Sequence, residues 1–142
     1  MRDTDGSTLS ILVVEDDIAV AELVRTILNQ VPGWGATIVH DGAAAREVFR
    51  HVRVEVLVLD VNLPGLSGIE LLALLRRDPR WAEPPVVVMS ANPNQPEITG
   101  AVRDGLVTRF LRKPFDVDEL VHEVHAAVAM TRVGASTGRR RA

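Results

Sequence analysis

The hydrophobic positions of this chain alternate five times between two patterns. Short apolar runs rich in β-branched residues predict strands, and strands apolar at nearly every position are typical of a parallel sheet covered on both faces. Between these runs, apolar residues recur every three or four positions, as on one face of a helix. The predicted strands cover residues 9–14, 36–39, 54–59, 85–89 and 108–112.

Capping signals mark where several of the predicted helices begin. Ser67, with Glu70 three residues later, forms a capping-box pattern, and Asp116 with Glu119 forms a similar one before the last helix. Asp41 is a suitable N-cap for a short alanine-rich helix. The sequence therefore predicts helices in all the places where a strand–helix alternation requires them.

Five strand–helix pairs predict one α/β domain with a parallel sheet, right-handed crossovers and helices on both faces. We expect this domain to cover residues 9–131. Residues 1–8 are expected to form a disordered N-terminus. Residues 132–142 are expected to form a flexible basic tail or the start of a linker, because three arginines there follow a Gly/Ser/Thr spacer.

Composition narrows the classes of function. The 142 residues include no cysteine, which excludes disulfides and thiolate metal sites and suits a cytoplasmic protein. No apolar run is long enough to cross a membrane. A net charge of −3 gives no reason to expect direct nucleic-acid binding by the domain.

Polar residues with a potential chemical role come at the carboxyl ends of the predicted strands, the edge where open α/β sheets bind ligands. The first strand is followed by three acids, the third by one acid, the fourth by a serine and the fifth by a lysine: Glu15, Asp16, Asp17, Asp60, Ser90 and Lys113. If the first and third strands are neighbours, at least three carboxylates share a small space. Such hard oxygen ligands favour Mg²⁺.

Lys113 stands out because it is the one lysine among 16 basic residues. A lysine ammonium is a compact charge on a flexible stem, which suits a carboxylate or a phosphoryl oxygen better than the rigid fork of arginine does. We therefore expect Lys113 to act at the same edge of the sheet.

Each of these residues also has an ordinary interpretation. Asp16 or Asp17 alone could simply cap the first helix. Asp60 alone would suit the turn that follows it, Ser90 alone is an ordinary strand-end hydroxyl, and Lys113 alone would simply be exposed. The functional interpretation is favoured because all of them fall at one edge of one sheet.

Four sequence runs carry a family resemblance: ILVVEDD (11–17), VLVLDVNLPGLSGIELL (56–72), VVVMSA (86–91) and FLRKPF (110–115). Together they resemble the signatures of response-regulator receiver domains. The resemblance implies a flavodoxin-like (βα)5 three-layer sandwich with a five-stranded sheet of order 2-1-3-4-5. It also implies the following roles: Asp60 as phosphoacceptor; Glu15, Asp16, Asp60 and the carbonyl of Asn62 as Mg²⁺ ligands; Ser90 and Lys113 as phosphoryl contacts; and Phe110 as the switch aromatic.

The resemblance implies a phosphoacceptor switch that catalyses only its own phosphorylation and dephosphorylation. Its partners would be a histidine kinase or a histidine phosphotransfer protein, together with an unknown output protein. One alternative is a receiver-shaped scaffold that is never phosphorylated. Another is a Mg²⁺-dependent phosphohydrolase with an aspartyl-phosphate intermediate, which would need an acid where this chain has Asn62.

Two features depart from the family pattern. The segment from Asn92 to Pro96 contains two prolines, so it delays the fourth helix, and glycines at 100 and 105 shorten it. Arg109 and Arg112 on the fifth strand do not match the charge pattern of regulators that dimerise through the surface around that strand. We therefore do not expect that type of dimer.

Overall fold

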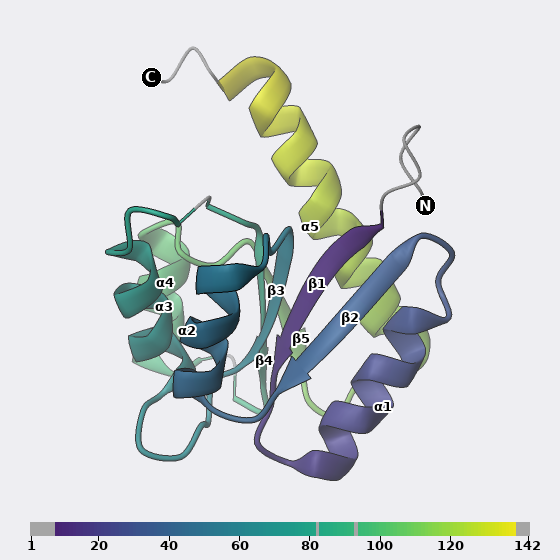
Figure 1. Ribbon diagram of the computed structural model, residues 1–142. Helices are drawn as coiled ribbons and strands as arrows, with labels where there is room; N and C mark the ends of the chain where they lie inside the picture. Colours follow the sequence, from purple (N-terminus) through teal and green to yellow (C-terminus); the bar gives the residue numbers. More distant parts are fainter. Residues whose placement is uncertain (1–7, 82, 93, 139–142) are drawn as a thin grey trace.

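A computed structural model describes residues 8–81, 83–92 and 94–138 of the protein (Figure 1). Strands and helices alternate throughout. The strands are β1 (Leu9–Val14), β2 (Trp34–Val39), β3 (Val56–Asp60), β4 (Val86–Ser90) and β5 (Arg109–Arg112). The helices are α1 (Ile18–Asn29), α2 (Gly42–His51), α3 (Gly68–Arg76), α4 (Pro96–Arg103) and α5 (Val117–Gly138).

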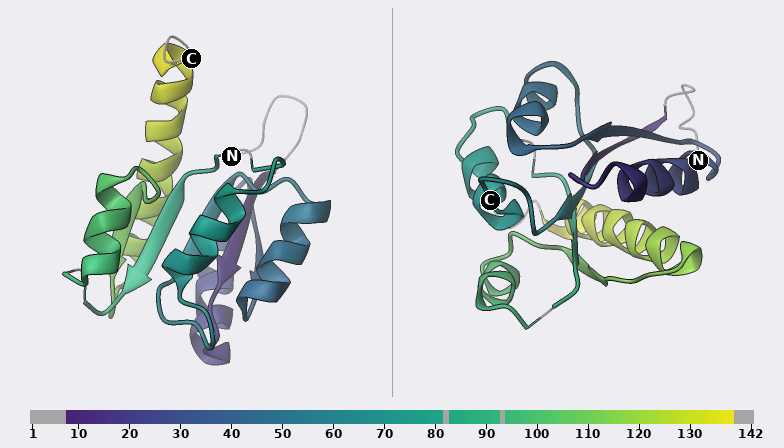
Figure 2. Two further views of the ribbon diagram at one scale, coloured as in Figure 1. Left: turned by 90° about the vertical axis from the view of Figure 1, so that its left-hand side faces the viewer. Right: turned by 90° about the horizontal axis from the view of Figure 1, so that it is seen from below.

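The five strands form one parallel sheet in the order β2-β1-β3-β4-β5, as expected. Helices α1 and α5 cover one face, and α2, α3 and α4 cover the other (Figures 1 and 2). The predicted flavodoxin-like three-layer sandwich is therefore confirmed.

The core consists of two apolar layers, one on each face of the sheet. Inward residues of α2, α3 and α4 pack against one face, and those of α1 and α5 pack against the other. The central strand β3 is buried along its whole length, which is why its sequence lacks the alternation typical of half-exposed strands.

Side-chain caps fix the starts of the helices. The Ser67 hydroxyl accepts a hydrogen bond from the Glu70 amide (3.1 Å), and the Glu70 carboxylate accepts one from the Ser67 amide (2.8 Å), so the predicted capping box is confirmed. Asp116 and Glu119 make the same reciprocal pair before α5. Asp41 caps α2 by accepting from the amide of residue 44.

The last helix differs from the sequence expectation. α5 continues to Gly138, whereas the predicted tail starts at residue 132. No proline interrupts residues 117–138, so nothing in the chain forces an earlier end. The far end of α5 extends past the edge at which the strands begin (Figures 1 and 2). Residues 1–7 and 139–142, which hold most of the predicted disordered N-terminus and the three tail arginines, lie outside the described residues.

α4 is short, with eight residues, as the prolines and glycines of that region predict. Among the described residues, no helix combines the length and the apolar character that a membrane span requires.

Candidate functional site

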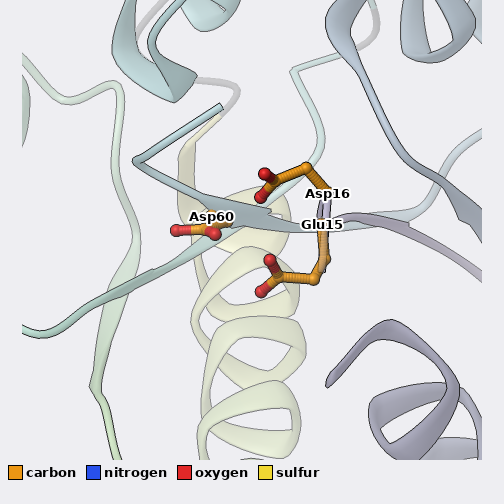
Figure 3. A group of neighbouring side chains, drawn as sticks. All are labelled: Glu15, Asp16 and Asp60. Atoms are coloured by element: carbon orange, nitrogen blue, oxygen red, sulfur yellow. The ribbon is translucent and has the colours of Figure 1, made fainter. Parts of the chain in front are cut away.

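The register of the sheet places Glu15 beside Asp60. Val14 of β1 pairs with Leu59 of β3, so the next residue of each strand lies at the same edge. One carboxylate oxygen each from Glu15, Asp16 and Asp60 lies within 4.8 Å of the others. Figure 3 shows the carboxyl groups of Glu15 and Asp16 turned to the side on which Asp60 lies. The predicted crowding of three carboxylates is therefore present.

The two adjacent aspartates after β1 have different surroundings. The Asp17 side chain accepts a hydrogen bond from the Val20 amide (3.1 Å) and is the N-cap of α1. Asp16 is exposed and belongs to the carboxylate cluster. The structure thus decides an alternative that the sequence left open: Asp17, not Asp16, caps the helix.

Lys113 joins two of the carboxylates. Its ammonium group donates to Glu15 Oε1 (2.9 Å) and to Asp60 Oδ2 (3.1 Å). It reaches them because the Lys113 backbone amide donates to the Ser90 carbonyl, which keeps the chain after β5 alongside the end of β4. The ordinary interpretation of an exposed lysine does not apply, since the Lys113 side chain is only 26% exposed.

The electrostatics of this cluster favour the gain of a cation. Glu15 is almost fully buried, and this burial together with a hydrogen bond to Asp60 raises the pKa of Glu15 to about 7. Lys113 opposes that shift. Burial on its own would lower the pKa of Lys113, but the bonds and charges of Glu15 and Asp60 raise it above its ordinary value. Lys113 therefore stays charged, and the carboxylates still outnumber it.

Ser90 ends β4 close to the cluster and is buried. Its hydroxyl contacts the carbonyl oxygen of Asn92 (3.2 Å) and the side-chain oxygen of Gln95 (3.1 Å), and it accepts from the Asn92 amide (3.0 Å). The hydroxyl is thus bonded to the segment that leads into α4, and not to Asp60.

Of the two remaining predicted residues, Asn62 contacts the site and Phe110 lies farther back along the sheet. The Asn62 amide donates to Asp60 Oδ1 (3.1 Å), which orients the carboxylate from the turn after β3. Phe110 on β5 is half-buried and packs against the apolar layer under α2, α3 and α4. The predicted polar side chains therefore lie at or next to the carboxyl edge of the sheet, whereas Phe110 pairs with Val88 in the middle of β4.

Gly68 supports the site but is not among the residues predicted from the sequence, although its position at the start of a helix is informative. A Cβ atom at Gly68 would overlap the Asp60 carbonyl oxygen and contact the Val61 Cα at 3.0 Å. The Gly68 amide also donates to the Val61 carbonyl (2.8 Å). A glycine between a helix N-cap and the first apolar helical residue indicates such a close approach.

His40 and Gln95 were also missed. The His40 ring nitrogen Nδ1 lies 3.0 Å from the Glu15 carbonyl oxygen, and since a carbonyl only accepts, Nδ1 must carry the proton. This bond holds the end of β1 against the end of β2. Gln95 contacts Ser90 as described above.

Comparison with known proteins agrees with the site. The family profile described as "Response regulator receiver domain" matches residues 11–125. The chain belongs to this family. Receiver domains are the phosphoacceptor modules of two-component signalling, and they act as switches rather than as enzymes with external substrates.

Individual relatives support the same assignment. The chain is 34% identical over 134 residues to "Probable transcriptional regulatory protein TcrX" of Mycobacterium tuberculosis, a match covering 94% of this chain and 55% of TcrX. The chain thus spans about half the length of the curated relatives it matches. NtrX from Brucella abortus superposes with a TM-score of 0.79 at 28% identity, covering 92% of this chain and 29% of that one. CheY4 of Vibrio cholerae, at 23% identity, shares the fold (TM-score 0.76; coverage 85% and 99%).

Proposed function

We propose that Asp60 is the phosphoacceptor of this receiver domain and that its phosphorylation requires Mg²⁺. The observation that carries the proposal is the convergence of two carboxylates and one ammonium group on a single buried aspartate. Asp60 is 3% exposed, and both Glu15 and Asp16 place an oxygen within 4.8 Å of it. An aspartate that only stabilised a turn would not require two neighbouring carboxylates and an ammonium group.

The donor set fits Mg²⁺. Glu15, Asp16 and Asp60 offer hard carboxylate oxygens, the ligands that Mg²⁺ prefers, and the backbone carbonyl of Asn62 is the fourth proposed protein ligand. Three carboxylates share this cluster with one ammonium group, that of Lys113, so a divalent cation would complete the neutralisation of charge there. When bound, Mg²⁺ would neutralise charge on the carboxylates and on the transferred phosphoryl oxygens.

The transfer itself is a displacement at phosphorus. An Asp60 carboxylate oxygen forms a bond to the phosphorus of a phosphohistidine, the phosphorus–nitrogen bond breaks, and the imidazole leaves with the electron pair and takes up a proton. The product is an acyl phosphate on Asp60. Because the transition state places charge on the three equatorial oxygens, the protein acts mainly by positioning groups and neutralising charge.

Lys113 and Ser90 are proposed to hold the phosphoryl oxygens. The Lys113 ammonium already lies 3.1 Å from Asp60, so a short movement brings it to a phosphoryl oxygen there. Ser90 lies on β4, next to β3, and would donate its hydroxyl proton. Phe110, which has no hydroxyl, would respond to this rearrangement through packing alone, as the switch aromatic.

The proposed partners follow from the chemistry and the family. The phosphoryl donor would be a histidine kinase or a histidine phosphotransfer protein, and an output protein or domain would read the switched surface. MtrA, a relative at 33% identity, is described as a DNA-binding response regulator, and this chain covers 49% of it. With a net charge of −3, the present domain is not proposed to bind DNA itself, and a cytoplasmic location is proposed.

Intact mass spectrometry tests this function. The protein is incubated with a small acyl-phosphate donor and magnesium chloride, beside the Asp60→Asn variant and a sample containing a metal chelator. The control is Asp104→Asn, an exposed aspartate at the end of α4. We expect one phosphoryl group on the parent and the control, and none on Asp60→Asn or without metal. A folded, Mg²⁺-binding protein that gains no phosphoryl group from this donor or from histidine kinases would instead be a scaffold.

A further inference from the structure

The side chain of Gln95 connects the phosphoryl-binding edge to the start of α4. Gln95 is the N-cap residue of α4, yet its side chain makes no capping bond to that helix. Its amide oxygen lies 3.1 Å from the Ser90 hydroxyl, five residues earlier and at the end of β4. This bond joins the last residue of a central strand to the first turn of a helix.

The Ser90 hydroxyl has one proton to donate. The Asn92 amide already donates to this oxygen (3.0 Å), so the proton goes to the Asn92 carbonyl (3.2 Å) or to Gln95 (3.1 Å). The two Asn92 contacts are local and belong to the turn that follows Ser90. The Gln95 contact is the one that reaches the helix.

The first turn of α4 is held by the burial of Ile98 and by hydrogen bonds within the turn, and the Gln95 side chain adds a bond to β4. It has only eight residues, begins with Pro96 and contains Gly100 in its interior. Its buried side chains are Ile98 and Ala101. A helix this short with an internal glycine is weakly stable alone. A single hydrogen bond at its N-cap therefore has a measurable effect on the stability of its first turn.

From this geometry we infer that Gln95 is a positioning residue that holds the Ser90 hydroxyl away from Asp60 until a phosphoryl group arrives. The inference rests on the proposed function of Asp60 and Ser90. A phosphoryl oxygen is a charged acceptor and attracts the hydroxyl more strongly than a neutral amide oxygen does. When Ser90 donates to the phosphoryl group, the Gln95 side chain is released and the start of α4 loses its tie to β4.

Because the Gln95 bond exists only in the unphosphorylated state, it opposes phosphorylation. Removing it should therefore favour the phosphorylated form. A hydrogen bond of ordinary net strength corresponds to about three- to tenfold in affinity. We expect Gln95→Leu to bind beryllium fluoride, a phosphoryl mimic, about three- to tenfold more tightly than the parent in magnesium chloride.

Calorimetric titration with beryllium fluoride tests this through a double-mutant cycle with Ser90→Ala. The matched control is Gln30→Leu, the same change at the exposed C-cap of α1. If Gln95 acts through Ser90, its substitution should have no effect in the Ser90→Ala background. An equal gain in both backgrounds, or no gain in either, would overturn the inference. If the parent binds no beryllium fluoride, the proposed function of Asp60 fails instead.

A second measurement needs no phosphoryl mimic. The amides of Ile98 and Thr99 donate to the Gln95 carbonyl in the first turn of α4. Hydrogen exchange at these two amides should become several-fold faster in Gln95→Leu and in Ser90→Ala, since both variants break the same tie. Unchanged exchange in either variant would contradict the tie, whatever the result of the titration.

Discussion

The ammonium group of Lys113 lies 3.1 Å from a carboxylate oxygen of Asp60, although the two residues are 53 positions apart in the chain. Asp60 ends β3, whereas Lys113 follows β5, two strands away in the sheet. The long, flexible lysine stem bridges that separation. The pair links the residue proposed to accept the phosphoryl group with the cation proposed to stabilise it.

Lys113→Met should destabilise the metal-free protein. Glu15 and Asp60 are both buried and would lose the cation they share, so we expect the free energy of unfolding at pH 8 to fall by about 1–3 kcal/mol. Urea denaturation measures this. The loss should shrink at pH 5, where Glu15 becomes protonated, and in saturating magnesium chloride. An equally stable variant at pH 8 would show that the bridge contributes nothing to folding.

Neighbouring aspartates provide a matched pair for the metal site. Asp16→Ala should weaken Mg²⁺ binding by tenfold or more, roughly the effect of losing one metal ligand or its support, and should not lower stability without metal. Asp17→Ala should leave Mg²⁺ affinity unchanged and lower the free energy of unfolding by about 1 kcal/mol, because it removes the cap of α1. Calorimetry and thermal unfolding separate the two effects, and a reversed pattern would contradict the assignment.

Mg²⁺ affinity should rise with pH between 5 and 7. The pKa of Glu15 in the folded protein is about 7, above its ordinary value of 4.5, so the folded state keeps a proton that the unfolded state has released. In metal-free protein, the free energy of unfolding should therefore fall as the pH rises from 4.5 to about 7, the range in which only the folded state holds the proton. Because Mg²⁺ must displace the same proton, its affinity should increase by at most about tenfold for each unit by which the pH rises in this range.

Glu15→Gln tests the origin of that pH dependence. The variant should bind Mg²⁺ more weakly and with a much flatter pH profile over the same range. A profile as steep as that of the parent protein would mean that another group titrates.

Gly68→Ala should destabilise the fold and disturb the end of β3. The added methyl group would overlap the Asp60 carbonyl oxygen, and such overpacking costs about 1–3 kcal/mol. Gly100→Ala is the control, since a Cβ there contacts only the flexible end of Arg103 at 3.6 Å. In α4 this change should stabilise the protein by about 0.5–1 kcal/mol. Equal effects of the two substitutions in thermal unfolding would contradict the close approach at Gly68.

Much of the site was predictable because the carboxyl ends of parallel strands meet at one edge. Once the strands were recognised from their apolar runs, Glu15, Asp60, Ser90 and Lys113 had to lie near each other. The family resemblance supplied the strand order, which the apolar pattern alone does not determine.

Other features depend on backbone geometry that residue patterns do not reveal. Either Asp16 or Asp17 could cap the helix by residue type, and the bond from the Val20 amide to the Asp17 side chain, together with the extended backbone of Asp17 (φ −76°, ψ 112°), identifies the cap. The contact of Gln95 with Ser90 depends on the path of the turn between β4 and α4. The helix α5 continues to Gly138, past residue 132 where the expected tail begins, and the residue pattern there does not indicate this continuation.

The most direct test of the central claim locates the phosphoryl group. After phosphorylation by a small acyl-phosphate donor with magnesium chloride, borohydride reduces an aspartyl phosphate to homoserine, and peptide sequencing by mass spectrometry identifies the reduced residue. We predict homoserine at position 60, in place of Asp60, and at no other aspartate. Homoserine at Asp16 or Asp17, or phosphorylation with Asp60 intact, would contradict it.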